Sequence, residues 1–569
     1  MNSQDSQATN GCAPYRTAPP QIHGIRKFGS SRTCILRLGM LLVCSLLFAS
    51  CGDDGSRSSF SAFPSSVPPI KFTGSMIAYD SFMPTLYDYR NADRYVEPLG
   101  LQNDGLGNLT RISTETLGLT SLFSVGRVNR DCRLADFNGD GFPDIVCNTY
   151  SPAEAYTANL PNSGESMSGF FCMDAADSYS AGSVAMLFFN NKDGTFTEDQ
   201  TFTGKAIRGY GETILVADFN NDGFLDIFLP YYSHCSANEH SYLLMNDGNG
   251  IFTDIADTAG VALRNVPLNF RVEGAQALDF DNDGWIDFYV GGHFFMNNHC
   301  VGESCHPTFS DQRAALGLPL LFDEGVKFLD WNNDGLIDIV VHHPATGPDL
   351  YQFNGRVFER SHGIPLLPSG TYENSYGMNV YDLNNDGKED IVLAGGSSIE
   401  EIVRHGRRSS NKNDAVILLN DGTGFELANE TLEDSRGNDI IAFGDMNRDG
   451  RMDIVTRIVK TGTLAYFRND TATPADSFLS IDVVGLNGEK NQQGRVVKVT
   501  PQNHKDIVFT RIVDGGSGFM AQNPYDLLVG TPYLETHTVK VYFRTGMVQF
   551  AINPGERKRV YPNGTIVNY

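Results

Sequence analysis

Six short acidic loops of nearly the same sequence recur through the middle of the chain and restrict what it can fold into. Each follows D-x-[N/D]-x-D-G-x-x-D, and they begin at Asp136, Asp218, Asp279, Asp330, Asp382 and Asp445. The first, third, fifth and ninth positions of the motif have oxygen-bearing side chains, and the sixth is glycine. This arrangement suits a hard cation that takes about six to eight oxygen ligands. A single copy is compatible with an acidic surface turn. Six copies, each with its ninth aspartate in place, predict six calcium sites.

The predicted calcium ligands are the first, third, fifth, seventh and ninth residues of every loop. They are Asp136, Asn138, Asp140, Phe142, Asp144; Asp218, Asn220, Asp222, Phe224, Asp226; Asp279, Asp281, Asp283, Trp285, Asp287; Asp330, Asn332, Asp334, Leu336, Asp338; Asp382, Asn384, Asp386, Lys388, Asp390; and Asp445, Asn447, Asp449, Arg451, Asp453. A helical EF-hand would need a glutamate at the twelfth position, and no loop has a carboxylate there. Apolar, β-branched residues follow each loop instead, so we expect the loops to connect strands.

A second signal follows most of the loops. An apolar residue and an Asn are followed within a few residues by Gly and Phe, as in Phe189-Asn190 with Gly194 and Phe196. Asn-Gly and Asp-Gly pairs between apolar runs indicate β-hairpins. Each unit then contains two hairpins, or four strands, and the acidic loops recur at intervals of 51 to 82 residues. Four-stranded units of this period are typical of β-propeller blades.

The two signals together resemble the FG-GAP or VCBS repeat family, calcium-loop propellers that also form the head of integrin α subunits. The resemblance covers residues 71–476 and implies an all-β, seven-bladed β-propeller. One blade, expected from residues 71–110 and strands after Asp453, would lack the acidic loop. A six-bladed ring is the alternative.

The last part of the chain, residues 477–569, has an alternating, strand-rich sequence that predicts a small β-sandwich-like domain. It resembles the ASPIC/UnbV module that follows such propellers in bacterial proteins and in the cartilage acidic protein family. The matching residues include Gly494 to Lys498 and Gly515 to Phe519 with Gln522. Near Tyr542 this chain lacks the Trp-Pro pair that is usual in the module.

The first residues are typical of a targeting segment. Basic residues precede an apolar run at residues 38–49, which has the length of a signal-peptide core and is too short to span a bilayer. The run ends at Phe48-Ala-Ser-Cys51, which resembles a bacterial lipobox. We therefore expect a signal peptide at residues 1–51, lipidation of Cys51, a flexible linker at residues 52–70, and a membrane-anchored extracytoplasmic lipoprotein on the outer-membrane, periplasmic or surface side. A simple cleaved signal peptide is the alternative.

Cysteine content and charge agree with an exported protein. After Cys51 an even number of cysteines remains, which favours disulfides: Cys132, Cys147, Cys172, Cys235, Cys300 and Cys305. Cys132 and Cys147 flank the first loop as cross-strand partners would, and Cys300 and Cys305 could instead bind zinc with His299 and His306. The net charge is −25, and 19 aspartates lie in the six loops, so much of the acidity is predicted cation ligand. This charge disfavours nucleic-acid binding.

Ligand recognition is expected at the end of the propeller opposite the acidic loops, because the long insertions fall there in the sequence. The candidate ligand-face residues are Tyr231, Tyr232, His293, His342 and His343. We predict a calcium-stabilised binding or adhesion protein for a carbohydrate or an extracellular protein. The alternatives are a carbohydrate-active lyase or hydrolase, with His342 and His343 as its best catalytic suspects, and a structural scaffold. No catalytic residue is assigned, because no nucleophile elbow, HExxH helix or phosphate-binding loop is present.

Overall fold

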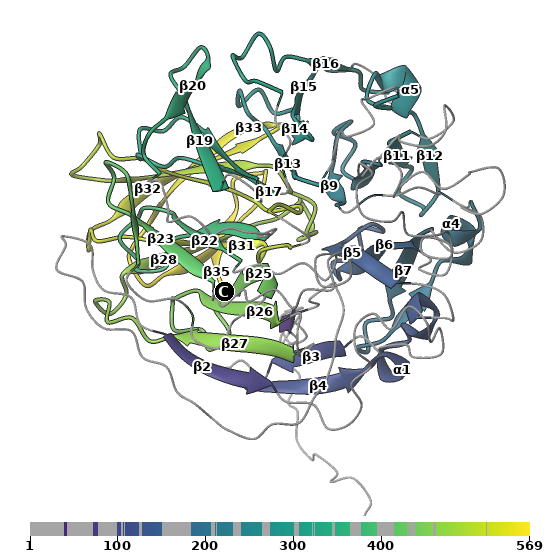
Figure 1. Cartoon of the computed structure of the whole chain (residues 1–569), viewed down its shortest axis with the longest axis horizontal. Helices are drawn as coiled ribbons and strands as arrows, with labels where there is room; N and C mark the ends of the chain where they lie inside the picture. Colours follow the sequence, from purple (N-terminus) through teal and green to yellow (C-terminus); the bar gives the residue numbers. More distant parts are fainter. Residues whose placement is uncertain are drawn as a thin grey trace, which may run out of the picture. The chain divides into compact units, whose positions relative to one another are not determined.

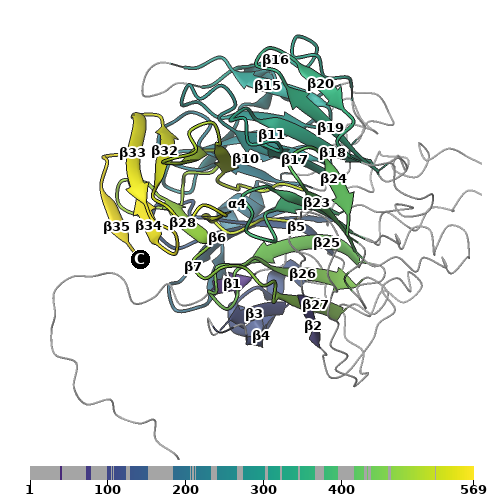
Figure 2. The ribbon, with the colours of Figure 1, turned by 90° about the vertical axis from the view of Figure 1, so that its left-hand side faces the viewer.

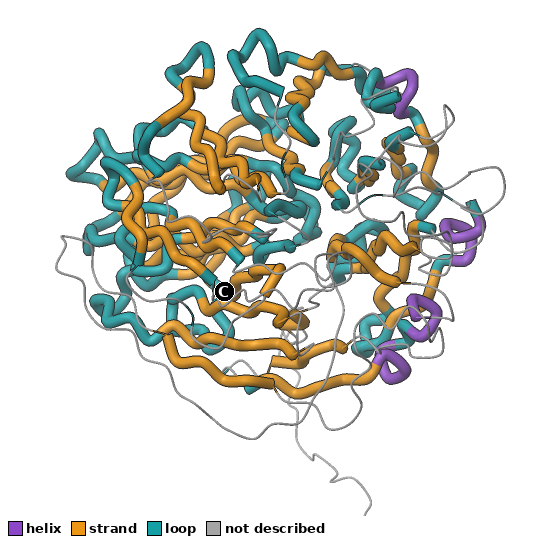
Figure 3. The backbone as a smooth tube through the Cα atoms, viewed as in Figure 1, coloured by secondary structure: helices purple, strands orange, loops and turns teal. Residues whose placement is uncertain are grey.

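The computed structural model describes residues 39–41, 72–77, 99–103, 106, 108–123, 128–150, 184–205, 207, 211, 213–231, 240–264, 273–300, 306–320, 323, 325–343, 347–364, 377–394, 415–428, 432, 438–458, 463–518 and 521–569. In these ranges the chain is nearly all β (Figure 3). The helices are short: α1 (Thr114–Leu117), η1 (Thr120–Phe123), α4 (Gln200–Gly204) and α5 (Ala256–Ala259). No helix in this part of the chain is long and apolar enough to cross a membrane.

Each acidic loop lies in its own four-stranded antiparallel sheet, so six such sheets occur in the described repeats (Figure 1). In chain order they are β5 (Val128–Ala135), β6 (Asp144–Tyr150), β7 (Ala185–Asn190), β8 (Phe196–Glu198); β9 (Leu215–Ala217), β10 (Asp226–Leu229), β11 (Tyr242–Asn246), β12 (Phe252–Asp254); β13 (Ala275–Leu278), β14 (Asp287–Val290), β15 (His293–Asn297), β16 (Phe309–Asp311); β17 (Gly325–Leu329), β18 (Asp338–His343), β19 (Gly347–Phe353), β20 (Phe358–Ser361); β21 (Met378–Tyr381), β22 (Asp390–Leu393), β23 (Val416–Asn420), β24 (Phe425–Leu427); and β2 (Phe72–Ile77) with β25 (Asn438–Gly444), β26 (Asp453–Ile458), β27 (Thr463–Asn469). The prediction of an all-β chain built from four-stranded units is confirmed.

The sheets are arranged as propeller blades, with their first strands side by side. Strands β5, β9, β13, β17, β21 and β25 contact one another in that order. The apolar cores lie between consecutive sheets, each built from side chains of two neighbours. The second strand of a sheet, such as β10 or β22, is therefore buried at every residue, because both of its faces are covered. This explains why the sequence after each acidic loop is continuously apolar.

The sixth sheet is completed from the other end of the repeats. Strand β2 pairs antiparallel with β27, from Phe72 opposite Asn469 to Ile77 opposite Leu464. The segment expected to build a loop-free blade is therefore divided, since β3 (Leu99–Asn103) and β4 (Leu109–Ser113) form a separate three-stranded sheet with β1 (Gly39–Leu41). The number of blades stays a prediction.

Two further four-stranded sheets make up the C-terminal domain (Figure 2). The first has the order β31-β28-β34-β35 and the second the order β30-β29-β32-β33. Their bounds are β28 (Phe478–Val483), β29 (Val496–Pro501), β30 (Phe509–Ile512), β31 (Asp526–Gly530), β32 (His537–Phe543), β33 (Gly546–Ile552), β34 (Arg557–Val560) and β35 (Ile566–Asn568). One apolar core, with Leu479, Val499 and Val541 among its members, joins the two sheets. The β-sandwich-like prediction for this region is confirmed.

Candidate metal centres

Every acidic loop connects the first and second strands of its sheet, and its first aspartate organises the turn. In the second loop, Asp222 N donates to Asp218 Oδ1 at 3.0 Å and Gly223 N donates to Asp218 Oδ2 at 3.0 Å. The fourth residue adopts a left-handed backbone conformation in all six loops, which is why Asn and Gly dominate there. These residues are Gly139, Asn221, Asn282, Asn333, Asn385 and Arg448, with φ between 55° and 69°.

The ninth aspartate closes the loop through two main-chain hydrogen bonds. Phe219 N donates to Asp226 Oδ2 and Asn246 N donates to Asp226 Oδ1, both at 2.9 Å. The other five loops repeat this pattern on Asp144, Asp287, Asp338, Asp390 and Asp453. The ninth aspartate, a predicted cation ligand, thus also joins the acidic loop to the second hairpin by hydrogen bonds.

The asparagine of the second hairpin links neighbouring sheets. Asn246 Nδ2 donates to the carbonyl of Phe137, the second residue of the preceding loop, at 2.8 Å. Asn297, Asn420 and Asn469 make the same bond to the preceding sheet. The sequence signal identified a hairpin, but this tie between blades depends on residues about a hundred positions apart and was not foreseen.

Glycine carbonyls at the sixth position connect one loop to the next. Asn221 Nδ2 donates to Gly284 O at 2.9 Å, and Asn333 and Asn385 make the corresponding bonds to Gly387 and Gly450. Two other carbonyls take a donor from the C-terminal domain instead: Asn491 Nδ2 on Gly223 O and Lys498 Nζ on Gly335 O, each at 2.7 Å. The C-terminal domain therefore completes the connections between loops.

Burial opposes ionisation of the aspartates in these loops. Desolvation raises the pKa of Asp136 to about 6, of Asp218 to about 7 and of Asp338 to about 8. It raises the pKa of Asp226, Asp287 and Asp390 well above the usual value. Nearby loop carboxylates add repulsion that raises several of these pKa values further. Such clusters favour a bound cation, because its positive charge would offset both the desolvation of the carboxylates and the repulsion between them.

The third loop has the donor set that best fits a hard cation. Carboxylate oxygens of Asp279, Asp281 and Asp283 lie within 4.8 Å of one another. Asp279 is fully buried, and its Oδ1 has no hydrogen-bond partner, whereas the equivalent oxygen of the second loop accepts from a main-chain N–H. A buried carboxylate oxygen without a hydrogen-bond partner is costly, so a cation bound at Asp279 Oδ1 would stabilise the loop. All the donors are oxygens, as calcium prefers.

A loop of the C-terminal domain, described at residues 514–518 and 521–523, lies among the first strands of four sheets; we call these residues the pin. Gln522 bonds both main-chain groups of Leu134 on β5, and Val216 N on β9 donates to Gly515 O at 3.3 Å. Gly518 N donates to Val326 O on β17 at 2.9 Å, and Asn523 bonds Asn379 on β21. A side chain at Gly516 or Gly518 would collide with neighbouring sheets, which accounts for the glycines.

A buried ion pair anchors the pin. Lys327 Nζ lies 3.3 Å from Asp514 Oδ2 and donates to Ser517 Oγ at 2.6 Å, and both charged side chains are almost fully buried. Burial opposes ionisation of Asp514, but Lys327 and hydrogen bonds from Asn523 N, Gly516 N and Ser517 outweigh it and lower the pKa of this carboxyl. Beside the pair is a small cavity of about 20 Å³, lined by Asp330, Glu389 and Arg511 among others.

The ligand-face candidates that the structure describes differ in their exposure. Tyr231 and His342, which the sequence made candidates for the ligand face, are buried, with exposed fractions of 1% and 0%. Tyr231 donates to Asn148 Oδ1 at 3.1 Å, and strand β18 continues through His342 and His343, so the two histidines point to opposite faces. His293 Nδ1 lies 2.8 Å from Asp311 Oδ2. Tyr232 lies outside the described residues.

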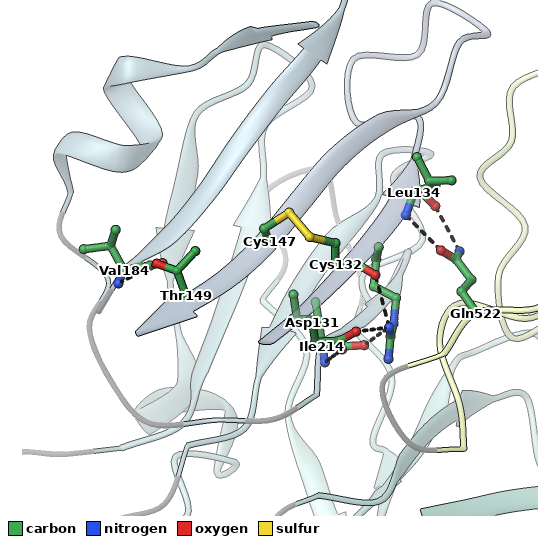
Figure 4. Close-up of a disulfide and its surroundings, with 9 residues drawn as sticks. Asp131, Cys132, Leu134, Cys147, Thr149, Val184, Ile214 and Gln522 are labelled. Atoms are coloured by element: carbon green, nitrogen blue, oxygen red, sulfur yellow. Dashed lines mark hydrogen bonds and ion pairs between the residues drawn. A yellow bond between two sulfur atoms is a disulfide. The ribbon is translucent and has the colours of Figure 1, made fainter. Parts of the chain in front are cut away.

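Cys132 and Cys147 form a disulfide across β5 and β6, at directly opposed positions with a Cα–Cα distance of 4.1 Å (Figure 4). Beside it Asp131 accepts from Arg133 and from Ile214 N of the next sheet. Cys300 is disulfide-bonded, so it has no thiolate for zinc and the zinc alternative is wrong for this residue. Cys51, Cys172, Cys235 and Cys305 lie outside the described residues.

Cys147→Ala is expected to lower the free energy of unfolding by about 3 kcal/mol, as the chain-entropy model gives for a loop of about 15 residues. Urea unfolding followed by circular dichroism measures it. The double variant with Cys132→Ala serves as the control and should match the single variant, since either change removes the bridge. An unchanged unfolding midpoint would contradict the expectation.

The FG-GAP-like repeat family model matches residues 174–229 and 330–393. Cartilage acidic protein 1 of Xenopus tropicalis is 26% identical over 198 residues, which are 32% of this chain and 28% of that protein. The mouse protein of the same name is 24% identical over 203 residues, or 34% of this chain and 30% of the relative. The chain thus matches less than a third of the length of these relatives.

Solved structures give only distant likenesses. The rhamnogalacturonan lyase YesW is 12% identical and covers 76% of each chain with a TM-score of 0.34. The Trypanosoma rangeli sialidase is 9% identical, covers 78% of this chain and 86% of its own, and has a TM-score of 0.32. Such scores carry no information on shared activity. The acidic-loop sheets and the matched segments together lead to one statement: this chain contains FG-GAP-like repeats and is similar, over 32% of its length, to cartilage acidic protein 1.

Proposed function

We propose that the protein is an extracytoplasmic binding protein whose propeller is stabilised by calcium in the acidic loops. FG-GAP-like repeats, which are typical of extracellular proteins, support the extracytoplasmic assignment. The observation that carries the calcium assignment is the third loop, where Asp279 Oδ1 is buried and unpaired beside Asp281 and Asp283. A bound calcium ion supplies two positive charges to these carboxylates. Lipidation of Cys51 would hold the protein at a membrane.

The ligand is proposed to be a carbohydrate or a protein bound at the end of the propeller opposite the acidic loops. In each sheet the acidic loop joins strands one and two, so the second strand ends at the opposite side. The acidic end is engaged by the C-terminal domain through Asn491, Lys498 and the pin. We therefore assign the proposed partner to the opposite end. A glycan and matrix-protein screen of the full chain tests it, with saturable binding expected and polysaccharide turnover counting against it.

Calcium added to the chelated full chain is expected to raise its melting temperature, because a ligand of the folded state alone stabilises it by about 2.7 kcal/mol per site at roughly one hundred times Kd. The only two tryptophans, Trp285 and Trp331, lie in the third and fourth loops, so intrinsic fluorescence should change over the same calcium range. Asp281→Asn should weaken the response of Trp285. If neither melting nor fluorescence responds to calcium, the metal assignment is wrong.

A further inference from the structure

Three arginines of the C-terminal domain lie against five of the six acidic loops. They come from different parts of that domain: Arg495 precedes β29, Arg511 is in β30 and Arg557 is in β34. Arg495 and Arg511 are each 3% exposed. Buried arginines are rare unless they are paired, so their surroundings show what each one neutralises.

Arg495 spans the second and third loops. Its Nη2 donates to Asn221 Oδ1 at 2.7 Å and its Nη1 donates to Gly284 O at 2.8 Å. The same Nη1 lies 4.0 Å from Asp279 Oδ2. One fixed positive charge is thus shared between two carboxylate clusters.

Arg511 lies against the fifth loop and acts electrostatically on Asp330 of the fourth, and Arg557 lies against the sixth. Arg511 Nη2 donates to Gly387 O of the fifth loop at 3.3 Å, and its Nη1 lies 3.6 Å from Glu389 Oε2. Its neighbour Thr510 donates to Asp330 Oδ2 of the fourth loop at 2.7 Å. Arg557 Nη2 donates directly to Asp445 Oδ2 of the sixth loop at 2.9 Å.

The first loop has a different electrostatic environment. Among the described residues, the cationic side chain that pairs with this loop is that of Lys192, whose Nζ lies 3.2 Å from Asp140 Oδ2. The Lys192 side chain is 49% exposed. Such an exposed pair contributes little. The residue of the C-terminal domain that acts on Asp136 is Glu489 rather than an arginine, and its negative charge raises the pKa of Asp136.

We propose that Arg495, Arg511 and Arg557 act as fixed counter-cations of the acidic loops, so that the loops divide into one strong divalent-cation site at the first loop and five attenuated ones. The inference rests on the proposed calcium binding. Its physical basis is Coulombic: a positive charge held beside a carboxylate cluster opposes the entry of a mobile cation. The C-terminal domain would then set the calcium affinity of the loops to which it is docked.

Isothermal titration of the chelated full chain with calcium alone tests the proposal. We expect one tight binding step followed by a weaker group, and Asp140→Asn should remove the tight step. Arg495→Met should tighten two of the weaker sites by roughly tenfold or more, because a unit charge is removed from beside them. Arg557→Met should tighten one site, and it gives a second reading if Arg495→Met fails to fold.

The matched control is Arg360→Met, which removes an exposed arginine paired with Asp349 on another part of the propeller and should leave every step unchanged. Absence of any calcium binding in the unaltered chain overturns both this proposal and the calcium assignment. Six equivalent sites, or unchanged affinities in folded Arg495→Met and Arg557→Met, overturn this proposal alone.

Discussion

Lys327→Met is expected to lower the free energy of unfolding by about 3–5 kcal/mol, the usual cost of breaking a buried ion pair by removing one partner. Asp514 would remain buried without its cation, and Ser517 would lose a hydrogen-bond donor. Because the pin contacts the first strands of four sheets, the loss of stability should affect the propeller and the C-terminal domain together. Chemical unfolding followed by intrinsic fluorescence and circular dichroism measures it, and the two transitions should coincide.

A double-mutant cycle separates the pair from its surroundings. Asp514→Asn keeps the shape of the side chain, so Lys327→Met with Asp514→Asn should cost clearly less than the sum of the single changes. Arg360→Met breaks an exposed pair with Asp349 and should cost no more than about 1 kcal/mol. If Lys327→Met and Arg360→Met lower the free energy of unfolding by the same amount, the buried pair does not anchor the pin.

Asp226→Ala should destabilise the protein by roughly 2–6 kcal/mol, since it leaves two buried main-chain N–H groups, of Phe219 and Asn246, without an acceptor at about 1–3 kcal/mol each. This loss is expected even in the presence of a chelator, because the two hydrogen bonds do not involve a metal. Asp226→Asn retains one acceptor oxygen and should cost less. Thermal unfolding in chelator and in calcium measures both variants.

The control for Asp226→Ala is Asp193→Ala, at an exposed hairpin where the carboxylate bonds only Thr195 of its own turn. Its melting temperature should be unchanged. If the Asp226→Ala variant and the unaltered protein have the same melting temperature in chelator, the ninth aspartate acts through the metal alone.

Local signals were sufficient for the architecture of the repeats. The glycine at the sixth position and the apolar run after Asp226 predicted a turn followed by a buried strand, and β10 is buried throughout. Both depend on residues adjacent in the chain: a left-handed backbone favours Asn or Gly, and a strand covered on two faces must be apolar. The functional residues were harder to place. His342 looked like a loop residue, but β18 extends beyond it and buries it.

By itself the sequence determined that this chain is all-β, that it is built from four-stranded units, and that each unit places an acidic loop between its first two strands. These are short-range properties, decided by periodicity and turn chemistry. Only the tertiary structure decided that Asn246 ties one sheet to the one before, that the pin lies among the first strands, and that Arg495 donates hydrogen bonds to two loops. Those contacts join residues about one hundred to four hundred positions apart, and no local pattern encodes which distant charge will meet which carboxylate.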